Sequence, residues 1–251
     1  MVIRADNQLQ SLQHIGRIVA TVLLEMQRHA RPGMTTAELD HFGDALMSAQ
    51  GAVSAPRITY DFPGATCISI NHEAAHGVPS HRQLQAGDLI NIDVSAMLDD
   101  YFADTGGSFV LNPDDSPRAA LKQRLCNAAR RARDAGIASV RAGQRINEVG
   151  RAIERSVRAT GFRIVRNVCS HGVGAALHED PVIRNYYDRF ANEVLEEGQV
   201  ITIEPFLSTN VSRVHELDDG WTLAGRPSSL FAQYEHSIVV TTGEPIVLTA
   251  I

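Results

Sequence analysis

The segment LINIDVSAMLDDYFADTGGSFVL, residues 89–111, contains two β-prone runs, and MLDDY between them indicates a tight turn. A hairpin centred between Leu98 and Asp99 would place Asp93 directly opposite Asp104. Opposed residues have Cβ atoms about 4.5–5.5 Å apart. Two ionised carboxylates at that separation repel each other unless a cation neutralises them. The pair therefore suggests a metal site, although a solvent-exposed polar hairpin face would explain it equally well.

Two more acidic residues interrupt apolar, β-prone runs: Glu204 in VITIEP and Glu235 in AQYEHSIVV. Such residues are costly to bury unless a cation neutralises them. Three histidines lie in turns bounded by glycine or proline beside a strand: His76, His171 and His178. Five residues together could hold a pair of divalent metal ions: Asp93, Asp104, His171, Glu204 and Glu235.

Composition sets the class of protein. The chain has 251 residues and a net charge of −6, so overall charge does not suggest a nucleic-acid partner. Three widely spaced cysteines, Cys67, Cys126 and Cys169, argue for a reducing compartment rather than a disulfide framework. The first ten residues lack the apolar core of a signal peptide, and no apolar run approaches the roughly 18 residues of a membrane span. We expect a soluble cytoplasmic protein.

Helical and strand patterns alternate along the chain. An apolar stripe at helical spacing over residues 7–29 ends before Pro32-Gly33, and Thr35 to Glu38 form a capping box for a second helix that stops at Gly51. Pro117 opens a third helix, and a fourth ends at Gly161. The remaining β-prone runs are TCISI, the two runs quoted above, FRIVRNV, QVITIEPFL and HSIVVTT.

The two halves of the sequence repeat. With a shift of 110 residues, RPGMTTAELD aligns with RAGQRINEVG, so Gly33 matches Gly143. One residue further out of register, Asp93 matches Glu204, and both end similar strands. We therefore predict a single α+β domain over residues 1–251, built from two lobes related by a pseudo-twofold axis, approximately 1–115 and 116–251. Their strand ends would converge on one central site.

The ordered motifs resemble those of type I methionine aminopeptidases, from the first helix to about Ile246. The matching motifs are NH-x(4)-HGVPS, INIDV, Asp104-Thr105, SHGVG-x(3)-HEDP, ITIEP, DGWT and QYEHSIVVT. The resemblance implies the pitta-bread (creatinase/aminopeptidase) fold, in which outer helices cover a central curved antiparallel sheet. It also implies removal of the initiator methionine from nascent proteins when the next residue is small, by water activated between two metal ions.

The resemblance assigns roles to individual residues. The five residues named above match the metal ligands, with Asp104 and Glu235 bridging both ions, and His76 and His178 match the substrate-contacting histidines. Glu204 would move the proton of the attacking water, and His178 would stabilise the oxyanion. Mostly oxygen ligands favour Mn²⁺, Fe²⁺ or Co²⁺ over a thiolate-type zinc site, with Zn²⁺ as a further option.

A pocket for the methionine side chain follows from the same resemblance. Its expected walls, together with the two histidines, are Tyr60, Phe62, Cys67, Leu177 and Trp221. Thr59 and Leu177 stand where the family more often has aromatic residues, and Ala175 stands where a larger polar residue is usual. The sequence therefore supports the reaction type more strongly than strict methionine selection.

Two rival functions share the fold. Prolidases and aminopeptidases P use the same metals but usually carry a large N-terminal domain, whereas here the catalytic lobe begins almost at Met1. A non-catalytic relative would have lost ligands, and the set of five is intact. Only 22 residues separate Pro181 from Glu204, so the helical insertion of the second methionine aminopeptidase class is absent.

The expected partner is a peptide or nascent-protein N-terminus, with no membrane contact, and we expect a monomer. Seven arginines cluster on the third and fourth helices and are interpreted first as a solvated face: residues 130, 131, 133, 141, 151, 155 and 158. A weak contact with ribosomal RNA is the sharper alternative, and it would be sensitive to salt.

Overall fold

The structure is a computed structural model that describes all residues from 1 to 251. Its helices are α1 (Asp6–His29), α2 (Thr36–Ala49), α3 (Ala55–Tyr60), α4 (Pro117–Ser139) and α5 (Ile146–Val157). The strands of the first half are β1 (Val53–Ser54), β2 (Cys67–Ile70), β3 (Glu73–Ala75), β4 (Leu89–Leu98) and β5 (Tyr101–Val110). Those of the second half are β6 (Arg163–Ile164), β7 (Cys169–Gly172), β8 (Glu179–Arg184), β9 (Val200–Ile203), β10 (Phe206–Ser208), β11 (His215–Glu216), β12 (Leu223–Ala224), β13 (Phe231–Gln233), β14 (His236–Val239) and β15 (Ile246–Val247).

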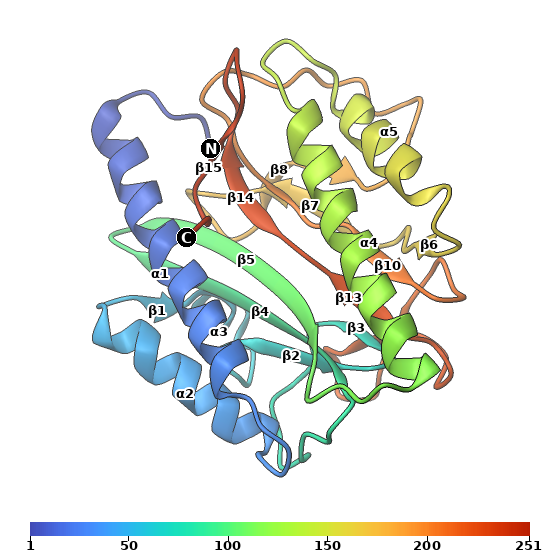
Figure 1. The fold of residues 1–251 in the computed structure, drawn as a ribbon. Helices are drawn as coiled ribbons and strands as arrows, with labels where there is room; N and C mark the ends of the chain where they lie inside the picture. Colours follow the sequence, from blue (N-terminus) through green and yellow to red (C-terminus); the bar gives the residue numbers. More distant parts are fainter.

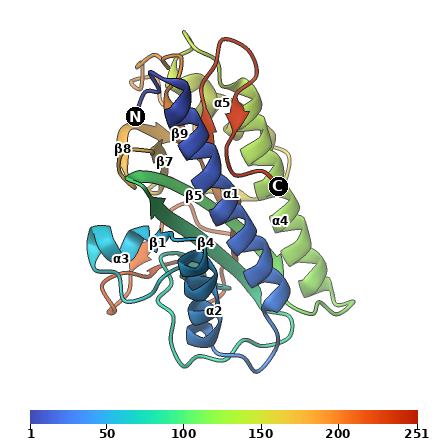
Figure 2. The same cartoon turned by 90° about the vertical axis from the view of Figure 1, so that its left-hand side faces the viewer.

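The four long helices lie outside antiparallel strands. Figure 1 shows α1 and α2 on one side of the molecule and α4 and α5 on the other, with β4, β5 and β14 between them. Figure 2 shows α1 lying across β5, and α4 also contacts this strand. The expected combination of outer helices with central antiparallel strands is confirmed.

Each helix pair covers its own apolar core. In the first half, α1 and α2 bury residues such as Ile15, Val19 and Leu39 against β2, β4 and β5. The predicted capping box opens α2: the Glu38 amide donates to the Thr35 hydroxyl at 3.1 Å, and the Thr35 amide donates to the Glu38 carboxylate at 2.8 Å. Two backbone N–H groups at the start of α2, which have no carbonyl partner within the helix, thereby gain hydrogen-bond acceptors.

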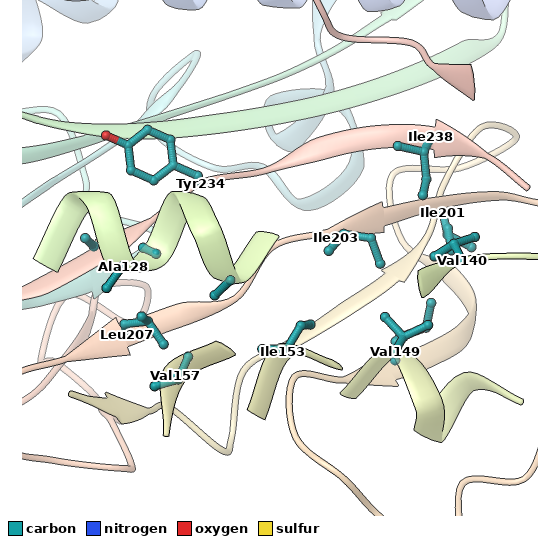
Figure 3. Close-up of a cluster of buried hydrophobic side chains, with 14 of the residues drawn as sticks. Ala128, Val140, Val149, Ile153, Val157, Ile201, Ile203, Leu207, Tyr234 and Ile238 are labelled. Carbon is teal, nitrogen blue, oxygen red and sulfur yellow. The ribbon is translucent and has the colours of Figure 1, made fainter. Parts of the chain in front are cut away.

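The second core lies under α4 and α5. Val149, Ile153 and Val157 recur at helical spacing along α5 and are all buried. In Figure 3 they face the strands that carry Ile201, Ile203 and Leu207. This packing fixes the position of β9, the strand that leads directly into Glu204.

The predicted hairpin forms, but its predicted register is wrong by two residues. Leu98 pairs with Tyr101, so the turn consists of Asp99 and Asp100, both at positive φ (51° and 65°). A two-residue loop with both residues in the left-handed region matches the twist of the flanking strands. Asp104 therefore pairs with Ser95, and Asp93 pairs with Gly106. Because side chains alternate with period two, the two aspartates still point to the same face of the sheet.

The internal repeat is visible in the hydrogen bonds. The amide of Gly33 donates to the Leu84 carbonyl at 2.9 Å, and the amide of Gly143 donates to the Leu195 carbonyl at the same distance. Both glycines have φ near +85°, which an L side chain rarely adopts (87° and 83°). The turn after the first helix of each pair is thus tied in the same way to the loop that precedes β4 or β9, about 110 residues apart.

The two sheets join at β5. The amide of Glu235 donates to the Gly106 carbonyl, and the amide of Asp104 donates to the Ser237 hydroxyl at 3.0 Å. A strand of the first half therefore lies against β13 and β14 of the second, and acidic residues from both halves meet at this seam. None of the helices combines the length and apolar character needed to cross a bilayer.

Candidate functional site

Buried acidic residues and one histidine gather at the seam between the sheets. Asp104, His171 and Glu235 each offer a ligand atom, and these atoms lie within 4.8 Å of one another. The carboxylate of Glu204 comes within 3.3 Å of His171 Nε2. Asp93, on the same face of the hairpin as Asp104, lines the same cavity. The structure thus brings together all five ligand candidates chosen from the sequence.

The electrostatics of this cluster fit a divalent cation. Burial, and next the charge of Asp104, raise the pKa of both Asp93 and Glu235 well above the usual range for carboxyl groups. One oxygen of each, Asp93 Oδ1 and Glu235 Oε1, is buried without any hydrogen-bond partner. Unsatisfied buried carboxylate oxygens are costly, and metal coordination is an arrangement that satisfies them. The residues present therefore fit a metal.

His171 is held by the acidic groups around it. Burial opposes its protonation, but a hydrogen bond that His171 donates to Glu204 and the charges of Glu204 and Asp104 together raise the pKa of His171 above its ordinary value. Its Nδ1 lies 2.9 Å from the Gly172 carbonyl oxygen. That contact orients the ring so that Nε2 faces Glu204. A backbone carbonyl commonly orients a metal-ligating imidazole in this way.

A set of polar neighbours orients the cluster, and sequence reasoning missed it. The Ser95 hydroxyl donates to Asp104 Oδ1 at 2.7 Å, and Gln233 Nε2 donates to Glu235 Oε2 at 3.0 Å. The Ser170 hydroxyl accepts from the amide of Glu204 at 2.9 Å. Ser95 lies two residues after Asp93 and Gln233 two residues before Glu235, so the period of a strand was an available signal.

Two cavities meet at the cluster. The larger has a volume of about 580 Å³ and is lined by His76, His178 and four of the ligand candidates. The narrower one, about 80 Å³, brings together all the pocket walls expected from the sequence: Tyr60, Phe62, Cys67, Leu177 and Trp221. Phe62 and Trp221 pack edge to face with ring centroids 5.2 Å apart. A small, largely apolar cavity therefore opens directly beside a polar one.

His178 connects the two cavities. Its Nδ1 lies 2.6 Å from the Tyr60 hydroxyl, and its ring centroid lies 4.2 Å from that of His171. Burial, and next the neighbouring His171, lower the pKa of His178 to about 4. Burial raises the pKa of Tyr60, so its phenol keeps its proton. A protonated phenol donating to Nδ1 leaves the ring proton of the neutral imidazole on Nε2.

His76 occupies an unusual backbone conformation. Its φ is 54°, in the left-handed region that non-glycine residues rarely adopt, and such residues cluster at functional sites. The next residue, Gly77, is constrained because a Cβ there would lie 2.2 Å from the Ile68 carbonyl oxygen. The turn places His76 in both cavities.

Comparison with known proteins defines the class. The model of metallopeptidase family M24 matches residues 10–242, and the chain belongs to this family. Members of this family use divalent metal ions, which agrees with the acidic cluster.

Methionine aminopeptidases are similar over the whole chain. Methionine aminopeptidase 2 of Bacillus subtilis is 46% identical over 251 residues, with 99% of each chain covered. The crystal structure of methionine aminopeptidase from Rickettsia prowazekii superposes with a TM-score of 0.93 at 31% identity, and all of both chains is covered.

The fold is shared more widely. The prolidase of Pyrococcus horikoshii superposes with a TM-score of 0.77 at 20% identity, which covers 99% of this chain and 63% of the prolidase. This likeness confirms the fold, and it leaves the prolidase alternative to be tested by substrate preference.

Proposed function

We propose that this protein is a methionine aminopeptidase that removes the first methionine from peptides whose next residue is small. The observation that carries the proposal is the narrow apolar cavity lined by Phe62, Cys67 and Trp221 beside the buried acidic cluster. A site of this kind can bind an unbranched apolar side chain and hydrolyse the bond next to it. Relatives of the same length and of 46% and 42% identity carry that name.

The acidic cluster would hold two divalent ions. The proposed ligands, four carboxylates and one imidazole, are Asp93, Asp104, His171, Glu204 and Glu235. This donor set suits Mn²⁺, Fe²⁺ or Co²⁺, and Zn²⁺ can also be accommodated. When bound, such ions polarise the scissile carbonyl and lower the pKa of water.

The residues around the cluster would act on the substrate. Glu204, held at its amide by Ser170, is proposed to take the proton of the attacking water and to pass it to the leaving amine. His178, neutral and with its remaining proton on Nε2, would donate to the oxyanion that forms at the scissile carbonyl. His76, held rigid by its turn, would contact the peptide on the same side.

Selection of the first residue should be moderate. Leu177 lines the pocket where an aromatic residue is more usual, whereas Thr59 does not line it. One methylene of contact changes discrimination by only about 1–3 kcal/mol. We expect kcat/KM on X-Ala-Ser peptides to be highest for Met, with Leu and norleucine within about tenfold and Ala far lower. Steady-state rates on the four peptides measure this. A preference for Ala or Pro at X would exclude the methionine assignment and leave the metal chemistry intact.

Metal dependence tests the reaction class. Chelation should abolish cleavage of Met-Ala-Ser, and adding Mn²⁺ or Co²⁺ to the stripped protein should restore it, because the site supplies mostly oxygen ligands. Parallel assays with Ala-Pro-Ala separate this function from the prolidase and aminopeptidase P type. Full activity in the presence of chelator would contradict a metallopeptidase mechanism, and faster cleavage of Ala-Pro-Ala would favour the rival.

The surroundings of the enzyme follow from the same proposal. We infer a single catalytic domain, a monomer, and a cytoplasmic protein whose substrates are peptide or nascent-protein N-termini. Its three cysteines are unpaired, as in a reducing compartment.

Some arginines of α4 and α5 pack on tyrosines: Arg130 lies 4.7 Å from the ring centroid of Tyr234 and Arg151 4.1 Å from that of Tyr187. A weak ribosome contact by the remaining ones would appear as salt-sensitive co-sedimentation.

A further inference from the structure

Two buried polar side chains lie on the inner face of α2. Thr36 and Asp40 are one helical turn apart and are exposed by only 2% and 5%. Neither lines a cavity of the proposed active site. A buried carboxylate outside both cavities requires an explanation, because burying it without strong partners is costly.

Asp40 binds the segment that precedes β2. Its carboxylate accepts hydrogen bonds from the amide of Ala65 at 3.0 Å and from the amide and hydroxyl of Thr66 at 2.7 and 2.8 Å. The Ala65 carbonyl is held in turn by the Ser54 hydroxyl at 2.8 Å, and Ser54 caps α3, the helix that carries Tyr60. One carboxylate therefore fixes the backbone between Phe62 and Cys67, two walls of the narrow cavity.

Thr36 binds the segment that follows His76. Its hydroxyl accepts from the amide of Ser80 at 2.8 Å and donates to the Ser80 carbonyl at 3.1 Å. The two clamped segments also touch each other: a Cβ on Gly64 would lie 2.7 Å from the ring of Pro79. The same face of α2 thus holds both the Phe62–Cys67 segment and the turn that carries His76.

The second half of the chain supplies an internal control. The repeat aligns Thr36 with Ile146 and Asp40 with Gly150. The two halves share an equivalent backbone hydrogen bond: the amide of Thr36 donates to the Arg82 carbonyl, and the amide of Ile146 donates to the Glu193 carbonyl. The second half has no equivalent of the hydrogen bonds made by the Thr36 and Asp40 side chains, because isoleucine and glycine stand there. At Gly150 the neighbouring backbone approaches so closely that a Cβ would lie 2.2 Å from the Tyr186 carbonyl oxygen.

The comparison separates folding from function. The second half packs its equivalent helix with an isoleucine and a glycine, so a polar pair is not required to dock such a helix on its sheet. The polar pair is present only in the half that supplies most residues lining the narrow cavity, including Tyr60, Phe62 and Cys67. The geometry points to Thr36 and Asp40 as positioning residues that set selectivity for the first side chain of the substrate, and this inference rests on the proposed function.

The test compares selectivity with a local optical signal. Trp221 is the only tryptophan of the chain and packs against Phe62, so its fluorescence reports on the wall that Asp40 positions. In Asp40→Asn, an amide nitrogen replaces one accepting oxygen. We expect the Met-to-Leu ratio of kcat/KM to fall from its wild-type value toward one, mainly through KM for the Met peptide, with greater acrylamide quenching of Trp221.

A milder variant and a matched control complete the design. Thr66→Val removes one bond to Asp40 with little change of shape, and a fall of the ratio by about threefold is expected. Asn147→Ala changes a buried polar residue of α5, which is exposed by 5%, and should lower Tm while leaving the ratio and the quenching unchanged. If Asp40→Asn does not fold, Thr66→Val decides.

The outcomes are distinguishable. Wild-type selectivity in both Asp40→Asn and Thr66→Val, or an equal loss in Asn147→Ala, would overturn the positioning role. Wild-type protein that shows no preference for Met would overturn the proposed function instead. In that case increased quenching of Trp221 in the Asp40 variant still supports the positioning of the wall, and unchanged quenching refutes it.

Discussion

Asp104→Asn is expected to lower kcat/KM on Met-Ala-Ser by more than about 100-fold. Losing a residue that only orients a metal ligand costs up to about 100-fold, and losing a ligand itself should cost more. Asp104 lies at the centre of the cluster, exposed by only 4%, with its carboxylate within 4.0 Å of His171 Nε2 and bonded to Ser95. Replacing it removes one negative charge from the proposed cation site and one acceptor oxygen. Elemental analysis should show weaker metal retention in parallel with the loss of rate.

The same substitution should stabilise the metal-free protein. The charge of Asp104 repels the carboxylates of both Asp93 and Glu235. Neutralising Asp104 removes this electrostatic repulsion from the folded, metal-free protein. We therefore expect a higher Tm than wild type in chelator. Asp99→Asn is the matched control, because it makes the same chemical change at the exposed turn of the same hairpin and should alter neither quantity. A variant that loses rate but melts lower than wild type without metal would contradict the charge argument.

His178→Ala is expected to reduce kcat by about 10²–10³, the usual cost of removing one oxyanion donor, while metal content stays at the wild-type level. The imidazole is neutral because burial lowers its pKa to about 4. We propose that the Tyr60 hydroxyl, 2.6 Å from Nδ1, donates to it and so keeps the ring proton on Nε2. Tyr60→Phe should therefore show a smaller fall, since the imidazole remains but its tautomer is no longer selected.

The control for His178 is His81→Ala, the same substitution at an exposed position, which should leave kcat unchanged. Steady-state kinetics and metal analysis of the purified variants decide the matter. Loss of metal from His178→Ala would assign this residue to the ligands rather than to the oxyanion.

Local patterns were sufficient to predict the long helices. The apolar stripe over residues 7–29 corresponds to α1, which spans Asp6–His29, and the capping box at Thr35 opens α2 as predicted. These signals succeed because helix periodicity and capping depend on residues only three or four positions apart. The repeat and the ordered motifs likewise named five acidic and histidine positions that the structure brings into one cluster.

Short elements and pairings were beyond local patterns. FRIVRNV reads as a seven-residue strand, yet only Arg163 and Ile164 pair, against β10. The six-residue helix α3 was not predicted, although it presents Tyr60 to His178 across 118 positions of sequence. Elements this short are stabilised by what they pack against, so their own residues carry little signal.

Sequence and tertiary structure therefore contributed different parts of this protein. The order of the long elements, the repeat and the chemical types at the site follow from sequence alone, because periodicity, caps and strand alternation are local. The hairpin register was decided by the left-handed conformation of Asp99 and Asp100, and the match of Asp104 with Ser95 follows from it. The meeting of Asp104 with Glu235, and of Asp40 with Thr66, was decided by how elements distant in sequence pack together, because such contacts exist only in the assembled core.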